Sequence, residues 1–286
     1  MRAGWIVAVL ALATPLYACS PEPEGKPILR ADMDGSGPIG EGRPADTVEA
    51  SATAPASSRK SACRTATFEG ARFTHCIADP VRHRIATDLG PDDGAPYRSL
   101  ATLAASRAAD APLVAFAVNG GMFDREGDPI GYYVEGGKRL EELNRADGPG
   151  NFHLKPNGVF FGTGNRWEVR EAENFYRNVG DRPAFGTQSG PMLVIDGKLH
   201  PEFSQDGPSR AVRNGVGVDA EGRAHFVISD SAVSFGRFAR YFRDRAKTRN
   251  ALFLDGNVSA LWDPVTGRLD SGAALGPLLV VEERSQ

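Results

Sequence analysis

The feature that most constrains the fold of this chain is the length of its apolar runs after residue 60. From there on, short alternating or apolar runs are separated by Gly, Pro, Asn and Asp. Runs of this kind, bounded by turn-forming residues, are typical of β-strands. We therefore expect strands at 65–69, 72–77, 113–118, 158–161, 167–170, 192–195, 211–218, 224–229 and 278–281.

Two or three helices are expected among these strands, and two of them can be placed. Residues 97–109 place Leu100, Leu103 and Ala104 on one helical face. Residues 234–247 carry aromatic residues at helical spacing, which we expect in the core, and arginines on the opposite side, which we expect in solvent. The aromatic residues are Phe235, Phe238, Tyr241 and Phe242. Together the elements predict a single α+β domain over residues 62–286, rich in strands, with a large mixed sheet and a few packed helices.

The N-terminal residues indicate export. Arg2 precedes an apolar run at 5–16 that is too short to span a bilayer and is followed directly by Tyr-Ala-Cys at 17–19. This arrangement resembles a lipoprotein signal, with a signal peptide at 1–18 and Cys19 as the acylated first residue of the mature protein. The alternative is an ordinary secretory signal cleaved nearby. Ser20 after the cysteine favours an outer-membrane lipoprotein that faces the periplasm.

Residues 19–61 are expected to form a flexible tether. Positions 20–60 contain no aromatic residue, and Pro, Gly, Ser and Ala fill more than half of them. Such a segment cannot bury enough apolar surface to fold. It predicts a partly extended linker that lets the domain reach away from its anchor.

The charge of the chain suggests neither a nucleic-acid partner nor an anionic membrane surface. Thirty-three Lys and Arg oppose 36 Asp and Glu, for a net charge of −3. No strong field would draw this protein onto nucleic acid or anionic lipid. We expect no nucleic-acid partner, and contact with a membrane only through the lipid anchor.

The remaining cysteines agree with export. Without Cys19 the chain has Cys63 and Cys76, which are placed to join two adjacent antiparallel strands by a disulfide in an oxidising compartment. The alternative is two buried free thiols. A zinc site would need two more ligands, and none of the five histidines has a zinc-binding spacing to the cysteines, so we expect structural histidines.

Three clusters of polar residues and glycines follow apolar runs, where a ligand can approach the backbone. In the first, Asn119 can both donate and accept hydrogen bonds to a sugar or phosphate, and Gly120 and Gly121 leave room for it. A tight turn is the alternative interpretation.

The second and third clusters carry charged groups. Arg213 lies in a glycine-interrupted apolar run, which makes it a candidate anion clamp, with a structural ion pair to a core carboxylate as the alternative. Asp255 follows the apolar run of residues 250–254 and precedes a turn. A carboxylate at a strand end is a common position for catalysis, and a simple hairpin is the alternative.

Taken in order with the segments between them, these clusters resemble the phosphodiester glycosidase family, and most closely its bacterial branch. The family includes the mammalian uncovering enzyme of the mannose 6-phosphate pathway. The resemblance spans about residues 114–281 and rests on the segments 119–123, 150–160, 187–194, 213–218, 250–259 and 276–278. One departure is that the animal enzymes have glycines after the aspartate where this chain has Asn257 and Val258.

The resemblance implies hydrolysis of a sugar 1-phosphodiester, in envelope or exopolysaccharide metabolism. Asp255 would act at the anomeric carbon, as nucleophile or by activating water. Arg213, assisted by N–H groups around Gly120 and Gly121, would stabilise the charge on the departing phosphate. The substrate-orienting candidates are Asn119, Asn157, Ser189, Asn214 and Ser259.

Several alternatives stay open. A non-catalytic envelope lipoprotein could use the same groove to bind a phosphate-containing glycan, and a transferase could use the same residues with an acceptor other than water. No cofactor is expected, although Asp255, Asn119 and a substrate phosphate could share a divalent cation. A second catalytic carboxylate is not identified: the nearby candidates, for which solvated surface is the default interpretation, are Asp124, Asp128, Glu135 and Asp230.

Overall fold

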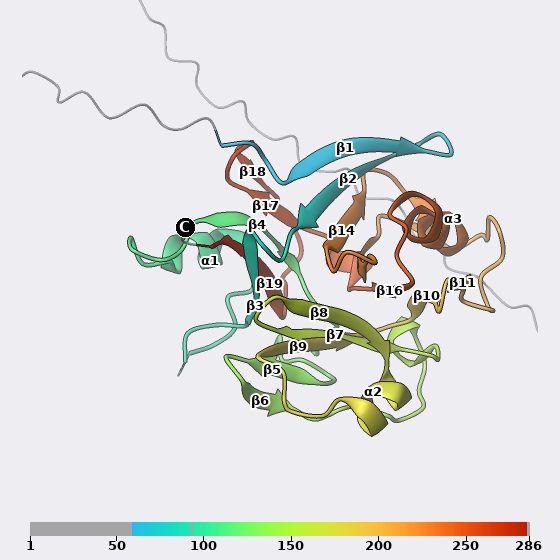
Figure 1. The fold of residues 1–286 in the computed structure, drawn as a ribbon, viewed down its shortest axis with the longest axis horizontal. Coiled ribbons are helices and arrows are strands. Elements are labelled where there is room, and N and C mark those ends of the chain that lie inside the picture. The colour runs from blue at the N-terminus through green and yellow to red at the C-terminus, as the bar shows by residue number, and fades with distance from the viewer. Residues whose placement is uncertain (1–58, 93, 285–286) are drawn as a thin grey trace, which may run out of the picture. The chain divides into compact units, whose positions relative to one another are not determined.

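The computed structural model describes residues 59–92 and 94–284, all within the compact unit Pro55–Gln286 (Figure 1). The expected signal peptide, Cys19 and nearly all of the expected tether lie outside the described residues. Within the described ranges, no helix has both the length and the apolar character needed to cross a membrane.

Sheet 1 has seven strands and is paired antiparallel throughout. From edge to edge it contains β1 (Cys63–Phe68), β2 (Ala71–Ala78), β14 (Ala224–Ser229), β13 (Asn214–Val218), β16 (Asn250–Phe253), β10 (Met192–Ile195) and β11 (Lys198–Leu199).

Sheets 2 and 3 have five strands each and are also antiparallel. Sheet 2 contains β18 (Arg268–Leu269), β17 (Leu261–Asp263), β4 (Val114–Asn119), β19 (Leu278–Glu283) and β3 (His83–Asp88). Sheet 3 contains β6 (Lys138–Glu141), β5 (Tyr133–Glu135), β9 (Phe185–Ser189), β7 (Gly158–Thr163) and β8 (Arg166–Glu171). A separate ladder pairs β12 (Arg210–Ala211) with β15 (Val233–Ser234).

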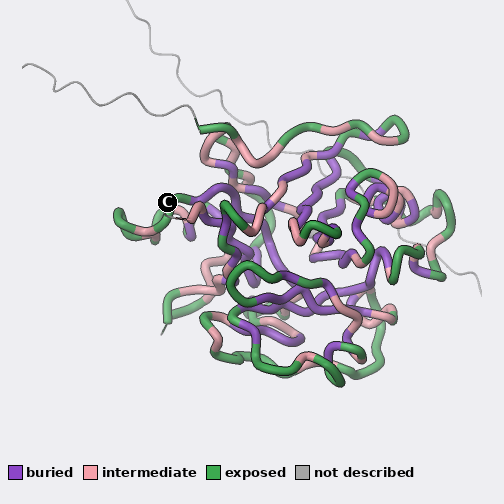
Figure 2. The backbone as a smooth tube through the Cα atoms, in the orientation of Figure 1, coloured by how far each residue is buried: buried purple, intermediate pink, exposed green. Residues whose placement is uncertain are grey.

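The three sheets share one central core, seen as the buried strands in Figure 2. It combines Phe226 and Leu252 of sheet 1, Phe116 of sheet 2, and Phe160 and Phe185 of sheet 3. The strand β4 is buried at every position, because β17 and β19 flank it and apolar clusters cover both of its faces. Its uninterrupted apolar sequence follows from that position.

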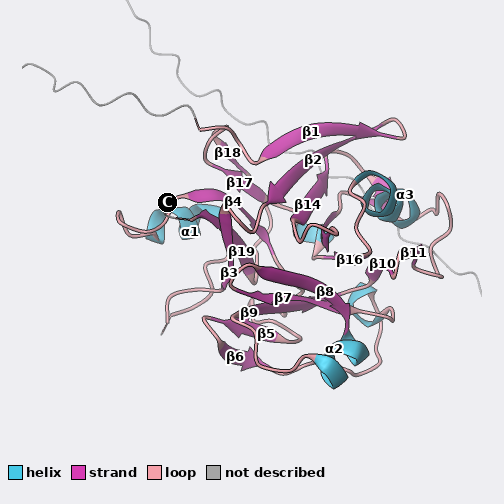
Figure 3. Ribbon diagram, in the orientation of Figure 1, coloured by secondary structure: helices cyan, strands magenta, loops and turns pink. Residues whose placement is uncertain are grey.

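Each large sheet packs a short helix on its outer face (Figure 3). Helix α1 (Leu100–Ser106) covers sheet 2 with Leu100 and Leu103, and α2 (Ala172–Asn178) covers sheet 3 with Phe175. Sheet 1 is covered by α3 (Phe235–Arg240), which continues directly into the π-helical turn η2 (Tyr241–Arg245). The expected aromatic stripe is confirmed as core, since Phe238, Tyr241 and Phe242 are buried there.

The strand-rich α+β class predicted from the sequence is confirmed. The large mixed sheet is replaced by three antiparallel ones, and the strand expected at 211–218 breaks at Val212 and Arg213 into β12 and β13, which belong to different sheets. The predicted helix at 97–109 is shorter, because its ordered turns begin only after the Ser99 cap. The sequence did not predict α2 or the strands β3, β5, β6, β9, β11, β15, β17 and β18.

The predicted disulfide is present. Cys63 and Cys76 face each other directly across β1 and β2 and are joined by a disulfide. It fixes the edge strand β1, most of whose side chains are exposed or half-buried, to a strand that enters the core.

Candidate active site

The candidate site lies where β4 of sheet 2 ends against strands of the other two sheets. Beyond Asn119, the N–H of Gly120 donates to the Pro277 carbonyl (2.7 Å), and the N–H of Gly121 donates to the Thr187 hydroxyl in β9 (3.1 Å). A Cβ at Gly121 would collide with the Gln188 carbonyl, so this approach of the backbone requires glycine. Both N–H groups are thus occupied by the protein, which differs from the role as anion donors expected for them.

Asn119 joins three segments of the chain through its side-chain amide. Its Oδ1 accepts hydrogen bonds from Asn214 Nδ2 (2.9 Å) and from the N–H of Ala260 (3.0 Å), and its Nδ2 donates to the carbonyl of Asp255 (2.8 Å). Asn119 is only 1% exposed. Its amide therefore holds segment 255–260 in position. Because one N–H of Nδ2 is used in this way, only the other N–H remains for a ligand.

Asp255 is held at its backbone by the end of β4. Its N–H donates to the Gly120 carbonyl (3.2 Å), while its own carbonyl accepts from Asn119. The next residues form the 3₁₀ turn η3 (Gly256–Val258), which carries the chain from β16 in sheet 1 to β17 in sheet 2. Asp255 thus lies on a crossing between sheets and not in a hairpin, and it is half-buried.

Two buried oxygens in this region have no hydrogen-bond partner among the described residues: Ser189 Oγ and Asn214 Oδ1. Ser189 ends β9, two residues beyond Thr187, and Asn214 begins β13. An unpaired buried polar atom costs about 1–3 kcal/mol, so proteins rarely keep one without a water or ligand to pair it. We refer to Asn119, Ser189, Asn214 and Asp255 as the Asn119 cluster.

Asn157 lies beside this cluster. It is buried, its Nδ2 donates to the Phe152 carbonyl (3.0 Å), and its Cβ packs where a side chain at Gly190 would otherwise stand. That bond caps the 3₁₀ turn η1 (Asn151–His153). A substrate contact by Asn157 stays a prediction.

Arg213 is one of the most deeply buried side chains, at 2% exposure. Its Nε donates to the Val233 carbonyl (2.9 Å), one Nη donates to the carbonyl (2.9 Å) and hydroxyl (3.1 Å) of Ser209, and the guanidinium stacks 3.5 Å above the Phe235 ring. These contacts belong to the α3 side of sheet 1, whereas the next side chain, Asn214, points to Asn119. Arg213 therefore does not share a binding surface with Asn214, and its role as an anion clamp stays a prediction.

Burial lowers the pKa of the Arg213 guanidinium to about 10. Because this value still lies above neutral pH, the side chain stays protonated. Its hydrogen-bond partners in the described chain are neutral oxygens, and the Phe235 face contributes a cation–π contact. The structural ion pair considered from the sequence is not among the ion pairs of the described residues.

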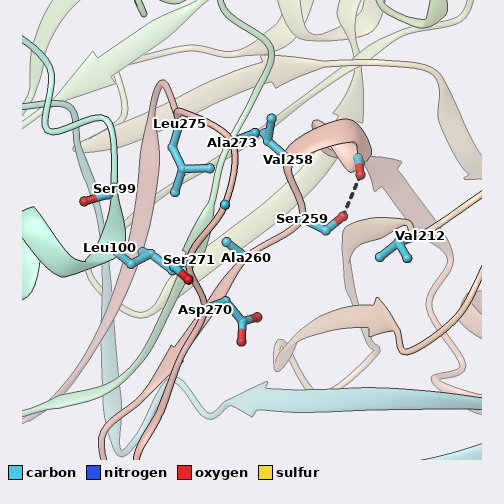
Figure 4. Close-up of a pocket in the computed structure, with 12 residues that line it drawn as sticks. Ser99, Leu100, Val212, Val258, Ser259, Ala260, Asp270, Ser271, Ala273 and Leu275 are labelled. Carbon is cyan, nitrogen blue, oxygen red and sulfur yellow. Dashed lines mark hydrogen bonds between the residues drawn. The ribbon is translucent and has the colours of Figure 1, made fainter. Parts of the chain in front are cut away.

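A cavity of about 230 Å³ opens beside segment 256–260 (Figure 4). Ser259, a predicted substrate-binding residue, lines it, and its hydroxyl donates to the Gly256 carbonyl (2.9 Å). Across the cavity lie Ser99, Asp270 and Ser271. Asp270 and Ser99 carried no signal in the sequence, because the cavity is assembled from segments far apart along the chain.

The other candidate carboxylates are in different settings. Asp124, Asp128 and Asp230 are exposed, and Asp124 caps its own turn. Glu135 differs from the expected solvated surface: it accepts hydrogen bonds from the Leu89 N–H and the Tyr133 hydroxyl, and burial raises its pKa. Burial, followed by the charge of Glu135, raises the pKa of neighbouring Asp88 to about 7.

The described residues contain no group of three or more His, Cys, Asp and Glu side chains that could hold a metal ion. The histidines bond within the protein, as His75 and His225 do with each other (2.9 Å).

Comparison with known sequences gives the family. The sequence model of the phosphodiester glycosidase family matches residues 113–271, more than half of the chain. The uncharacterized protein YigE of Escherichia coli K12 is 36% identical over 149 residues, which are 52% of this chain and 58% of YigE. This chain therefore spans less than two thirds of the length of that relative.

Solved structures give the same fold. The zebrafish N-acetylglucosamine-1-phosphodiester alpha-N-acetylglucosaminidase catalytic domain, auto-inhibited by its pro-peptide, matches with a TM-score of 0.52 at 15% identity, over 78% of this chain and 82% of that one. A protein from Burkholderia pseudomallei described as exported matches with a TM-score of 0.50 at 13% identity, over 74% of each chain. With the sequence match over residues 113–271, the chain belongs to the phosphodiester glycosidase family.

Proposed function

We propose that this protein hydrolyses sugar 1-phosphodiesters, splitting the bond between the anomeric carbon and the phosphate oxygen. The observation that carries the proposal is the Asn119 cluster, in which a carboxylate-bearing segment is fixed to the end of β4 beside two buried oxygens that lack partners in the described chain. Membership in the family supports this reaction class over others.

Asp255 acts at the anomeric carbon. Glycoside hydrolysis needs a carboxylate there, either as nucleophile or to activate water. The hydrogen bonds of its backbone to Asn119 and Gly120 fix the start of the turn that carries this carboxylate. The departing phosphate monoester has a second pKa of about 6, so it leaves without the strong general acid that a sugar alcohol requires.

The unpaired atoms of the cluster bind the substrate. Ser189 Oγ can donate to a phosphate oxygen, and Asn214 Oδ1 can accept from a sugar hydroxyl. Each thereby gains the hydrogen bond that it lacks in the described chain. Since the Gly120 and Gly121 N–H groups are occupied, the side chains of Ser189 and Asn214 take over the positioning expected of them.

Arg213 acts through its charge and not by contact. It is protonated, buried, and adjacent in sequence to Asn214, and low-dielectric surroundings screen its field less than water would. We expect Arg213→Met to lower kcat and Arg213→Lys to retain more of it. Equal kcat in the two variants, with both folded by circular dichroism, would exclude an electrostatic role.

The cellular role completes the proposal. An exported lipoprotein acylated at Cys19 and facing the periplasm, at the outer membrane, would meet phosphodiester-linked sugars in envelope glycans or exopolysaccharide. Metabolic labelling with palmitate tests it: we expect label in the parent chain and none in Cys19→Ser. Equal labelling of both chains would contradict acylation at Cys19.

A second candidate is a non-catalytic lipoprotein that binds phosphate-containing glycan. It is favoured by the internal pairing of the Gly120 and Gly121 N–H groups and the burial of Arg213, because these groups were expected to stabilise a leaving phosphate. The two candidates differ in whether Asp255 is needed for the observed effect.

The experiment measures release of free sugar from a panel of sugar 1-phosphodiesters by the full-length chain and by Asp255→Asn. Turnover by the parent and none by the variant is the expected result. Saturable binding without turnover by either chain would replace hydrolysis with glycan binding.

A further inference from the structure

We propose that the 230 Å³ cavity beside η3 is a binding site for one uncharged sugar ring, with Asp270 and Ser259 as its hydroxyl-binding side chains. This inference rests on the proposed function in one respect, namely that it assigns the ring of the substrate's sugar to this cavity and leaves the phosphate to Ser189 of the Asn119 cluster.

The charges that line the cavity favour a neutral ligand. Among the described residues that line the cavity, Asp270 is the only one with a charge, and none is a lysine or arginine. A phosphate in the cavity would meet the Asp270 carboxylate and no lysine or arginine of the lining, because Arg268 pairs with Asp270 from outside the cavity, so a neutral ligand is favoured. The lining thus favours a neutral ligand, while Ser189, the proposed phosphate donor, lies in β9 and does not line the cavity.

Asp270 and Ser259 can each accept a further hydrogen bond. Asp270 accepts from the Leu261 N–H (3.0 Å) and twice from Arg268 (2.9 and 2.7 Å), which fills three of the roughly four acceptor positions of a carboxylate. Arg268 also compensates its charge without lining the cavity. One acceptor position therefore remains for a hydroxyl of the ligand, and the Ser259 oxygen, which donates to Gly256, can still accept.

The size and the apolar walls of the cavity suit a single sugar ring. The cavity holds about eight water volumes at roughly 30 Å³ each, which suits one ring and not an oligosaccharide. Its apolar walls, Leu100, Val258 and Leu275, suit the C–H faces of a ring (Figure 4). Val258 follows Asp255 by three residues on the turn η3, so a ring in the cavity lies next to the segment that carries the catalytic carboxylate.

Part of the cavity lining comes from outside the stretch of the chain that matches the family. The lining residues Ser99, Leu100, Gly272, Ala273 and Leu275 lie outside the stretch 113–271 that matches the family. The cavity therefore combines residues inside the matched stretch with residues outside it.

The test measures binding of methyl glycosides of glucose, galactose, mannose and N-acetylglucosamine to the full-length chain by saturation-transfer NMR and calorimetry. The blocking variant is Ala273→Trp, at an exposed position that lines the cavity, and the matched control is Ala274→Trp, the next exposed position, which does not line it. We expect at least one glycoside to bind, Ala273→Trp to weaken it at least about 10-fold, equivalent to about 1.4 kcal/mol, and Ala274→Trp to leave it unchanged. Inorganic phosphate should not compete.

Three results would overturn the proposal: no glycoside of the panel binds, Ala273→Trp leaves the affinity unchanged, or inorganic phosphate competes with the glycoside. Phosphodiester turnover is measured on the same preparations, which separates the two proposals. Glycoside binding that is blocked by Ala273→Trp in a chain without turnover would retain the sugar site and reject hydrolysis. If no glycoside binds and turnover is unaffected by Ala273→Trp, hydrolysis is retained and the sugar site is rejected.

Discussion

The Asn119 cluster and a second polar network, which we call the histidine chain, each include an aspartate and differ in how completely their atoms are paired. The histidine chain runs from the Tyr241 hydroxyl to His75 Nδ1 (3.0 Å), from His75 Nε2 to His225 Nδ1 (2.9 Å), and from His225 Nε2 to Asp219 (2.9 Å). It links η2 to β2 and β14. Every ring nitrogen in it has a partner.

The ionised end of the histidine chain fixes the direction of its hydrogen bonds. Although burial opposes it, bonds from His225 and Arg223 lower the pKa of Asp219, so its carboxylate accepts from His225 Nε2. His225 Nδ1 must then accept from His75 Nε2, and His75 Nδ1 accepts from Tyr241. A network with one consistent arrangement and no orphan atom stabilises a fold, whereas the Asn119 cluster contains two buried oxygens that have no partner in the described chain.

The largest expected effect is on catalytic activity at the Asn119 cluster. Asp255→Asn should lower kcat on a sugar 1-phosphodiester at least about 10³-fold, because the amide can neither attack nor activate water. Asp196→Asn, an exposed turn carboxylate paired with Arg249, is the matched control and should keep full activity. Steady-state kinetics measures both, and an active Asp255→Asn would remove Asp255 from the reaction.

The next effect concerns stability within the Asn119 cluster. Asn119→Ala removes three hydrogen bonds and leaves the Ala260 N–H without its partner. The Asp255 carbonyl and Asn214 Nδ2 each keep only a longer contact, to the Val258 N–H (3.4 Å) and the Asn119 carbonyl (3.5 Å). We expect a loss of about 3 kcal/mol in the free energy of unfolding, together with a loss of turnover. Urea unfolding followed by circular dichroism measures the first. A stable but inactive variant would show that Asn119 contacts the substrate and does not merely position segment 255–260.

A third effect tests the histidine chain by pH. Burial, followed by the charge of His225, lowers the pKa of His75 to about 3 in the folded protein, against an ordinary value near 6.5. The unfolded chain therefore binds more protons between these values, and stability is complete above about pH 6.5 and falls as the pH drops toward 3. Relative to pH 7, we expect this group to cost about 2 kcal/mol at pH 5.

The comparison for this effect is His75→Gln, which cannot titrate. Its unfolding free energy should change less between pH 7 and pH 5 than that of the parent. Asp88 acts in the opposite sense, because its raised pKa, about 7, makes its contribution decline as the pH rises from about 4 toward 7. It is present in both chains, so it cancels in the difference. Equal pH slopes in the two chains would mean that His75 does not govern acid stability.

The parts of the fold that the sequence predicted are those where local pattern and burial agree. The strands β10 and β14 were predicted with their observed bounds, since apolar side chains face core on both sides. The strand β9 was missed because its sequence, FGTQS, is polar at three of five positions although all five are buried. One of those polar residues, Thr187, accepts a hydrogen bond from the Gly121 N–H at the candidate site, so the polarity that hid the strand belongs to its contact with β4.

The site was predictable only in part for a related reason. The order of motifs brought Asn119, Asn214 and Asp255 into one hypothesis, and the structure joins them by hydrogen bonds. The side chains of Arg213 and Asn214 point to opposite sides of the chain. The sequence analysis placed both in one strand and one site, because it did not recognise that the strand breaks at Val212 and Arg213. Asp270 was missed because only the fold brings it to the cavity.

The smallest expected effect is also the sharpest test of the comparison between the two networks. Ser189→Ala removes a buried hydroxyl that has no partner in the described chain. Because no hydrogen bond within the protein is lost, the free energy of unfolding should stay within about 0.5 kcal/mol or rise slightly. Turnover should fall about 10-fold, about 1.4 kcal/mol, if the hydroxyl binds the phosphate in the transition state.

The matched control for Ser189→Ala is Ser229→Ala, which removes a buried hydroxyl that does have a partner, the N–H of Arg213 (2.9 Å). That variant should lose about 1 kcal/mol of stability, since it leaves a buried donor unpaired. If Ser189→Ala loses as much stability as Ser229→Ala and keeps its activity, then its hydroxyl is structural. The distinction between a closed network that stabilises the fold and an open one that binds a ligand would then fail at Ser189.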